Sequence, residues 1–282
     1  MRIDLHAHSD VSDGTDDPAG LVAAAATAGL DVVALTDHDT MAGVDVAKIA
    51  GESAGVTVIR GVEITCEFES VTVHLLGLGC DPADDALALA MADVRQGRVL
   101  RLPRMVAALN AAGIGITEED VMAQITGGAT PGRPHVADAM VALGVVRDRQ
   151  EAFDQWLDVG RPGYIGHVKI DLTRGIELVA AAGGASVLAH AWGRQSRRVL
   201  PAAVIAHLAA AGLDCLEVDH QLHDAETRAA LREISAATGL VQTGSSDYHG
   251  TGKVNHDLGC NLTPESSFDA IRSLVEARGG RL

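Results

Sequence analysis

The sequence predicts an α/β fold in which successive β/α units close into a barrel of about seven strands. The first observation is a repeating order: an Ala-rich helical stretch, a Gly, a short β-branched strand, and then a His, Asp or Glu. The second is composition, because 47% of the residues are hydrophobic but only 2% are aromatic, which favours an aliphatic α/β core. The third is length, since 282 residues fit one large α/β domain or a domain with an insertion.

An open, doubly wound sheet is the alternative arrangement of the same units. Short continuous apolar runs between helices are typical of any parallel sheet that is covered on both faces, so the pattern does not separate the two. No G-x-G-x-x-G follows the first strand, which disfavours the dinucleotide-binding version of the open sheet.

The units can be placed in order along the chain. A first short strand ends near His6, and a hairpin is expected where residues 71–76 follow closely behind another strand. Helices are expected at 21–28, 176–182, 204–211 and 229–238, and strands at 32–36, 56–59, 71–76, 187–189, 215–218 and 240–243. Gly follows each of these helices, as expected for the residue just beyond a helix C-terminus.

The repeating order breaks between residues 84 and 164. A helix at 86–112 contains Pro103, which should start or kink a segment, and Thr117 opens another helix. A loop at 130–135 precedes a helix at 136–143. We therefore predict a barrel domain from residues 1–83 and 165–282, with a small helical insertion domain at 84–164 that caps the strand ends and rejoins the barrel through residues 161–164.

Charge and composition exclude several classes of partner. A net charge of −16 argues against binding of long duplex nucleic acid, but a short nucleotide at a local cationic or metal-rich site remains compatible. The four cysteines show no C-x-x-C spacing, so buried free thiols are expected. No leader-like segment and no apolar run of about 20 residues occur, which predicts a cytoplasmic protein that does not bind membranes. Oligomeric state is not determined by the sequence.

Polar residues with metal-binding side chains cluster at the predicted strand ends. His6 and His8 are two apart, so both imidazoles point to one side of an extended strand. His74 joins them only if it faces the same way as Glu63. The full candidate set is His6, His8, Asp13, His38, Glu63, His74, His190, Asp247 and His249. Nine donors suit two or three divalent ions, and imidazole with carboxylate favours Mn, Fe or Zn.

Other candidate residues are cationic or are histidines outside this set. Candidates for binding a substrate phosphate are Arg133, His135, Lys169, Arg194, Arg197 and Arg198; the pair at 197–198 also fits the solvated start of a helix. His207 lies mid-helix and is expected to be structural, whereas His167, His220, His223 and His256 are left open. A G-x-S-x-G nucleophile elbow and a Walker-type phosphate loop are both missing.

These motifs resemble the PHP (polymerase and histidinol phosphatase) family. The resemblance lies in DLHAHS at 4–9, TDH at 36–38, GVE at 61–63, HLLG at 74–77, AH at 189–190 and SDYH at 246–249. It implies a distorted (β/α)7 barrel with three metal ions at one face. The first ion would be held by His6, His8, Glu63 and Asp247, the second by Asp13, His38 and His249, and the third by Glu63, His74 and His190.

The resemblance also implies an activity. Many family members have His where this chain has Asp13, and the Asp variant is similar to the subgroup that acts on nucleotides. By similarity to that subgroup, the substrate phosphate would be bound by Arg133, His135 and Lys169. The expected enzyme is a phosphoric ester hydrolase that attacks 5′-AMP, a 3′,5′-nucleoside bisphosphate or the 5′ ends of short oligonucleotides through a metal-bridging hydroxide. Candidates for protonating the leaving group are Asp37, His190 and His223.

Three alternatives remain open at this point. Histidinol phosphate phosphatase activity would use the same fold, although the insertion and Asp13 weigh against it. A non-catalytic module that docks to a polymerase would be expected to have lost metal ligands, and this chain has lost none. A C–N amidohydrolase would share the barrel and its metals.

Overall fold

The computed structural model describes residues 1–193 and 196–282, so Arg194, one of the candidate cations, lies outside the described residues. Seven strands follow one another in a single hydrogen-bonded path: β1 (Ile3–Ala7), β2 (Val32–Leu35), β3 (Thr57–Phe68), β4 (Val71–Leu78), β6 (Ala185–Ala189), β7 (Cys215–Asp219) and β8 (Val241–Gly244). A two-residue strand, β5 (Ile170–Asp171), pairs with β3 beside this path.

The path nearly closes on itself. The backbone N–H of His8, just after β1, donates to the carbonyl of Tyr248, just after β8, at 2.8 Å. Ala7 and Tyr248 also form an isolated parallel bridge. The prediction of a barrel is therefore confirmed, and the alternative of an open sheet is not.

One strand distorts the barrel. All neighbouring pairs on the path are parallel except those of β4, which runs antiparallel to both β3 and β6. The predicted hairpin is thus confirmed as β3–β4, turning at Glu69 and Ser70 with positive φ. Because β4 runs the opposite way, its first residues lie at the end of the barrel where the other strands finish.

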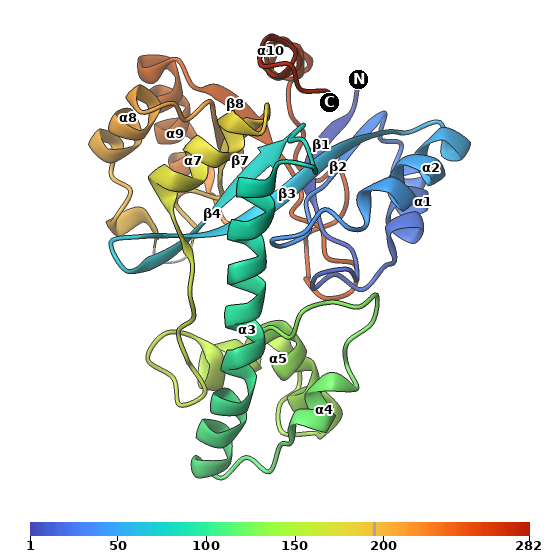
Figure 1. Ribbon diagram of the computed structural model, residues 1–282, viewed down its shortest axis with the longest axis vertical. Coiled ribbons are helices and arrows are strands. Elements are labelled where there is room, and N and C mark those ends of the chain that lie inside the picture. The colour runs from blue at the N-terminus through green and yellow to red at the C-terminus, as the bar shows by residue number, and fades with distance from the viewer. Residues whose placement is uncertain (194–195) are drawn as a thin grey trace.

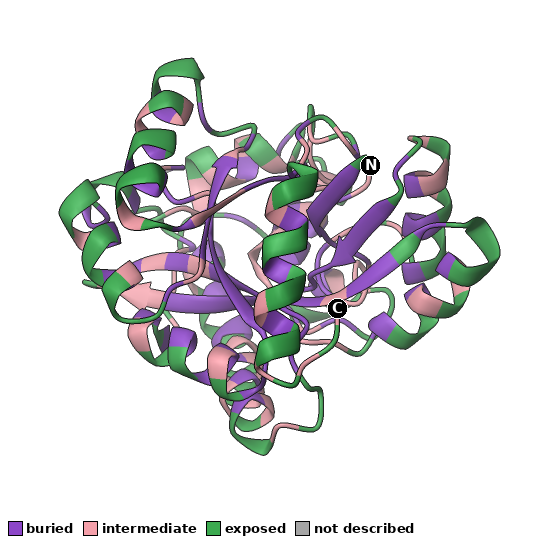
Figure 2. Cartoon of the chain, turned by 90° about the horizontal axis from the view of Figure 1, so that it is seen from above, coloured by how far each residue is buried: buried purple, intermediate pink, exposed green. Residues whose placement is uncertain are grey.

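Helices surround the strands. They are α1 (Pro18–Thr27), α2 (Val44–Ala54), α7 (Leu172–Ala181), α8 (Ala202–Ala210), α9 (Ala225–Thr238) and α10 (Glu265–Ala277). Figure 1 shows α7, α8 and α9 on one side of the strands and α1 and α2 on the other. Figure 2 shows buried strands inside helices whose outer faces are exposed. The helices α2 and α10 were not among the predicted ones.

The predicted insertion is helical. Its elements are α3 (Asp85–Ala111), α4 (Glu118–Met122), α5 (Arg133–Ala142), α6 (Arg149–Ala152) and a π-helix (Phe153–Leu157). Figure 1 shows that α3 starts beside the strands and runs to α4 and α5, which lie beyond one end of the barrel. Pro103 lies inside α3 and does not start a new helix. Residues 130–135 were predicted as a loop, but α5 already begins at Arg133, because Pro134 is favourable in the first turn of a helix.

Three further details correct or refine the predictions. Cys66, Cys80 and Cys215 are buried free thiols as expected, but Cys260 is exposed because it lies in the irregular segment after β8. Residues 196–198 form a short 3₁₀ helix in which Arg197 stacks 4.6 Å over the Trp192 ring. Among the described helices, none is long and apolar enough to cross a membrane.

Candidate metal centre

Four donors that lie within or just beyond three strands converge on one point. The Nε2 atoms of His6 and His8 are 3.1 Å apart, and Glu63 Oε2 lies 3.3 Å from the first and 3.0 Å from the second. Asp247 Oδ1 is 3.5 Å from both nitrogens. Four ligands held at ~2.1 Å around one ion in a tetrahedron would be about 3.4 Å from one another. The donor set therefore has the size that a single divalent ion requires.

A second group lies on the other side of His8. Asp13 approaches His249 Nε2 at 3.3 Å, His38 Nε2 at 3.6 Å and His8 Nδ1 at 3.7 Å. Asp13 lies in the turn that follows β1, and His38 follows β2, so these side chains meet only because the two strands are neighbours. His8, Asp13, His38 and His249 have donor atoms within 4.8 Å of one another.

Glu63 is the centre of the whole cluster. Its Oε1 lies 2.7 Å from His74 Nδ1 and 3.0 Å from His190 Nε2, while its Oε2 faces His6, His8 and His38. The expectation that Glu63 ends a strand is wrong, because β3 continues to Phe68. Glu63 instead lies where β3 stops pairing with β2 and begins to pair with β4. Leu76 is opposite Glu63, so His74 shares its face, as the prediction required.

The protonation states suit cation binding. Burial by itself would raise the pKa of Glu63, but the surrounding imidazoles, first His74 and then His38, hold it well below its usual value. Burial lowers the pKa of His190 to about 3 and that of His249 to about 4. Ionised carboxylates and neutral imidazoles are the forms that bind metals.

The surroundings of His6 and of His38 would each be stabilised by a bound cation, for different reasons. Burial would lower the pKa of His6, yet Glu63, Asp247 and Glu217 raise it well above its usual value, because three carboxylates face one ring. His38 Nδ1 is buried and, among the described residues, has no hydrogen-bond partner, although Glu63 Oε2 is 3.2 Å away. A divalent ion would replace the proton on His6 and give the lone pair of His38 a partner.

Glu217 is a supporting residue that the sequence reasoning missed. It is fully buried in β7, where Oε1 accepts from His6 Nδ1 at 3.1 Å and from the Ser245 hydroxyl. Its Oε2 accepts from the His190 backbone N–H at 2.6 Å. A proton on Nδ1 leaves the Nε2 lone pair of His6 facing the cluster, which is the carboxylate–histidine arrangement of metal sites. The available signal was a Glu inside an otherwise apolar strand.

Backbone strain also marks the site. His190 and Asp247 have φ values of 31° and 53°, and Asp39, which follows His38, has 55°. Such values are unfavourable for residues other than Gly and concentrate at functional sites. Asp39 is held by hydrogen bonds from Thr65 and Arg98, so the neighbourhood of His38 is fixed from two sides.

The three candidate proton donors differ in how their atoms are engaged. Asp37 accepts from the Ser9 N–H at 2.8 Å and from the hydroxyls of Ser9 and Ser12 at 2.7 Å, and burial raises its pKa to about 6. His190 faces Glu63. His223 Nδ1 donates to the Val218 carbonyl at 2.9 Å, and its Nε2 accepts from the Trp192 N–H at 3.3 Å. Proton transfer from His223 would break one of these hydrogen bonds.

The three phosphate-binding residues that the family resemblance implies each contact different neighbours. Arg133 lies 5.4 Å from the Phe153 ring centre and 5.7 Å from that of Tyr164. The backbone N–H of Gly132 donates to His135 Nδ1 at 3.1 Å within α5's first turn. Lys169 Nζ pairs with Glu67 Oε2 at 2.5 Å.

Two of the remaining histidines, His220 and His256, lie close to Asp247. His220 Nδ1 accepts the Leu222 N–H at 3.1 Å, so its Nε2 carries the proton and donates to Asp247 Oδ2 at 3.3 Å. Lys253 Nζ lies 2.6 Å from the same oxygen. Asp247, His220 and His256 are close enough to hold an ion, but a protonated Nε2 and the Lys253 ammonium oppose one there. His207 is exposed on α8, away from any of these groups.

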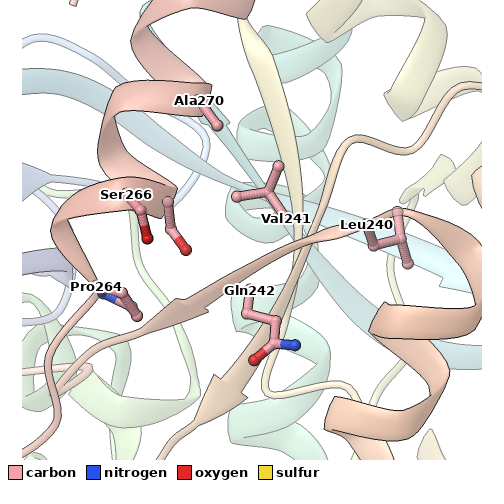
Figure 3. A pocket seen from close by; sticks show the side chains of 7 residues that line it. Leu240, Val241, Gln242, Pro264, Ser266 and Ala270 are labelled. Atoms are coloured by element: carbon pink, nitrogen blue, oxygen red, sulfur yellow. The ribbon is translucent and has the colours of Figure 1, made fainter.

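A cavity of about 370 Å³ lies at the opposite end of the barrel. It is lined by residues at the start of β8 and the first turns of α10, including Val241, Gln242 and Ser266 (Figure 3). Asp247 and His249 of the candidate centre follow the end of β8, so this cavity is separate from the centre.

Comparison with known proteins agrees with the geometry. The PHP domain model matches residues 4–177. A 3′,5′-nucleoside bisphosphate phosphatase from Chromobacterium violaceum is 34% identical over 92% of this chain and 90% of its own length. A 5′-3′ exoribonuclease from Haemophilus influenzae is also 34% identical, over 67% of this chain and 68% of its own length.

Similarity extends to solved structures. A protein from Bifidobacterium adolescentis, assigned as a metal-dependent phosphoesterase, superimposes with a TM-score of 0.92 at 40% identity, and the match covers 96% of each chain. Together with the convergence of nine histidines and carboxylates at one end of the barrel, these matches show that the chain belongs to the PHP domain family.

Proposed function

We propose that this chain is a metal-dependent phosphoesterase that hydrolyses phosphate esters of nucleotides: a 3′,5′-nucleoside bisphosphate, 5′-AMP or the 5′ end of a short oligonucleotide. The observation that carries the proposal is the spacing of His6, His8, Glu63 and Asp247. The two imidazole Nε2 atoms lie 3.0–3.5 Å from each other and from one oxygen of each carboxylate. Relatives with closely similar chains are named for phosphate ester hydrolysis, which supports the same reaction class here.

The donor set fits two or three ions. His6, His8, Glu63 and Asp247 would hold the first; Asp13, His38 and His249 the second; and Glu63, His74 and His190 the third. Mixed imidazole and carboxylate donors favour Mn, Fe or Zn. When bound, such ions polarise the phosphoryl group and make water a strong nucleophile near neutral pH.

The chain's own residues then orient the substrate and manage protons. Arg133 and Lys169 are the cations that we propose bind a substrate phosphate. Phe153 and Tyr164 contact the first, and Glu67 pairs with the second. Asp37, His190 and His223 remain the candidate proton donors to the leaving oxygen. Of these, Asp37 also fixes the turn that carries Asp13, through Ser9 and Ser12.

Nucleotides are favoured over the alternatives by the relatives. One is named for 3′,5′-nucleoside bisphosphates and another for RNA, whereas neither name concerns histidinol phosphate. All nine predicted metal ligands are present and converge, which disfavours a non-catalytic module.

Metal depletion and reconstitution test the proposal. The protein is treated with a chelator, dialysed, and assayed with and without Mn²⁺ on adenosine 3′,5′-bisphosphate, 5′-AMP, a 5′-phosphorylated oligonucleotide and histidinol phosphate. Phosphate or nucleotide release should require the metal and should exclude histidinol phosphate. His249→Gln should lose at least 100-fold in activity, while the matched control His207→Gln keeps it. Equal hydrolysis by metal-free protein would overturn the proposal.

A further inference from the structure

A buried guanidinium outside the metal centre has no counter-ion in the part of the chain that the structure describes. Arg101, on α3, is only 5% exposed, and its Nη1 lies 3.0 Å from His167 Nδ1. Among the described residues, Arg101 Nε and His167 Nε2 are both buried without a hydrogen-bond partner. No carboxylate of the described chain forms an ion pair with Arg101, although acidic residues outnumber basic ones by 38 to 22.

The surroundings increase the energetic cost of burying Arg101 without a counter-ion. Burial, followed by the charges of Arg133 and Arg98, lowers the pKa of Arg101 to about 9. Burial, followed by Arg101, Arg98, Lys169 and Arg133, lowers the pKa of His167 to about 2. A buried cation among other cations destabilises a fold unless an anion compensates it.

Two cations that border this cluster, Arg98 and Lys169, contact β3 close to the metal centre. Glu63, Thr65 and Glu67 alternate onto the same face of that strand. Arg98 donates to Thr65 Oγ1 at 2.6 Å, and Lys169 pairs with Glu67. Since a strand rises about 3.3 Å per residue, Thr65 and Glu67 lie ~7 and ~13 Å beyond Glu63. The cations thus begin about one nucleoside's length from the site of hydrolysis.

A short irregular segment covers the cluster on one side. His167 lies between Gly166 and Val168 in a segment without regular structure, and both neighbours are exposed. A Cβ atom placed on Gly166 would meet no other atom within 4 Å. Across the segment, Gly97 of α3 packs against His167 and Val168, which keeps His167 over Arg101.

We propose that Arg101 and His167, bordered by Arg98 and Lys169, form a second anion-binding subsite that holds the phosphate one nucleoside away from the phosphate being hydrolysed. This inference rests on the proposed function and narrows its substrate class to molecules with two phosphates. The second phosphate comes either from a nucleoside bisphosphate or from the next phosphodiester of an oligonucleotide. Both present the same oxygens to the guanidinium.

Steady-state kinetics of Arg101→Gln test the subsite. For the Mn²⁺-loaded enzyme, kcat/KM on adenosine 3′,5′-bisphosphate should fall ~10- to 100-fold, the usual effect of losing a charge-assisted hydrogen bond to phosphate. Values for adenosine 3′-monophosphate and 5′-AMP should change less than threefold. Arg104→Gln is the matched control. Arg104 is exposed on the same helix, and its substitution removes the same charge. Arg101→Lys should recover part of the selectivity.

The two sources of the second phosphate are separated by substrate. A 5′-phosphorylated dinucleotide should show the same loss if the subsite also takes a phosphodiester, and no loss if it takes only a terminal phosphate. Equal losses on monophosphates and bisphosphates in Arg101→Gln would overturn the subsite but leave the proposed function standing.

Binding to metal-free protein gives a readout that does not depend on turnover. Equilibrium dialysis with adenosine 3′,5′-bisphosphate should show that Arg101→Gln raises the Kd ~10- to 100-fold. His167→Gln should raise the Kd less, and Arg104→Gln should leave it unchanged. If no phosphate ester is hydrolysed by wild type with any metal, the proposed function fails, and this measurement still decides the subsite. An unchanged Kd in both Arg101→Gln and His167→Gln would refute the subsite.

Discussion

The carboxylate of Glu217 is engaged by His6, by the backbone of His190 and by Ser245, which come from three separate strand ends. Burial would raise its pKa, but His6 and His220 lower it, so the group stays ionised. An ionised acceptor at His6 Nδ1 fixes the tautomer in which Nε2 faces the candidate metal centre.

Glu217→Gln should therefore weaken metal binding without removing a ligand. The neutral amide keeps the volume but loses the charge that orients His6, so the affinity of the tightest ion should fall ~10- to 100-fold. Titration of metal-free protein with Mn²⁺ measures this change. Glu233→Gln, at an exposed position on α9, is the control. Identical affinities in both variants would show that Glu217 does not orient the ligand.

The depressed pKa of His167 predicts a pH effect on stability. Its pKa is about 2 in the folded protein, against 6.5 ordinarily, so the unfolded chain binds the proton more strongly. Stability should be fully present above pH 6.5 and decrease as pH falls below it. His167→Gln should reduce this slope between pH 6.5 and 4.5, measured as Tm in buffers without phosphate or sulfate. A slope equal to that of wild type would contradict the electrostatic account of this residue.

At the scale of elements, α3 belongs to two hydrophobic clusters. Leu87, Met91 and Val94 in its first half pack with the main barrel core. Leu102 and Leu109 in its second half pack in a separate cluster with α4, α5 and the π-helix. The predicted domain boundary at residue 84 therefore precedes a helix whose first half contacts the barrel. Arg98 and Arg101 lie between the two halves, and Arg98 pairs with Asp39, which follows the candidate ligand His38.

Truncating Leu109 tests whether the predicted insertion is an independent unit. Leu109 is fully buried, so Leu109→Ala should lower the free energy of unfolding of its own cluster by ~2–5 kcal/mol. Hydrogen exchange should accelerate in α4 and α5 but not in β1 to β4. Leu87→Ala should accelerate exchange in the barrel instead. Uniform acceleration in both variants would mean that the chain unfolds as one unit.

For the whole molecule, the metal centre concentrates negative charge in a chain whose net charge is already −16. Asp13, Glu63 and Asp247 are buried together, and their pKa values are held well below the usual range. In each case burial opposes this, and nearby His or Lys side chains overcome it. Divalent ions would relieve the remaining repulsion throughout the barrel end, because the donors come from most of its strands.

Metal removal should therefore destabilise the fold. An ion at 100 times its Kd stabilises the native state by about 2.7 kcal/mol, so Mn²⁺ should raise the Tm of chelator-treated protein by several degrees. Differential scanning calorimetry with and without Mn²⁺ measures the shift. The shift should shrink in Asp13→Ala and persist in His207→Gln. A Tm that is insensitive to Mn²⁺ would contradict a metal centre in this cluster.

Much of the fold was predictable because its cause is local. Gly after Ala-rich helices and short β-branched runs predicted five of the principal β/α units, and the short link before residues 71–76 predicted the β3–β4 hairpin. The same pattern placed His6, His38, His190 and Asp247 beside strand ends. Arg133 was placed in a loop because Gly132 and Pro134 flank it, although Pro is also favourable in a first helical turn.

What the sequence by itself determined is the type of protein: an α/β barrel of the PHP family whose strand ends carry imidazoles and carboxylates. Only the tertiary structure decided which side chains touch. Glu63 lies within a long strand, and the closing of the barrel is what brings His74 and His190 to it. Arg101 gave no local signal, and the signal of Glu217 was only a charged residue in an otherwise apolar strand. A buried charge is defined by neighbours that are distant in sequence, and those contacts depend on how strands and helices pack.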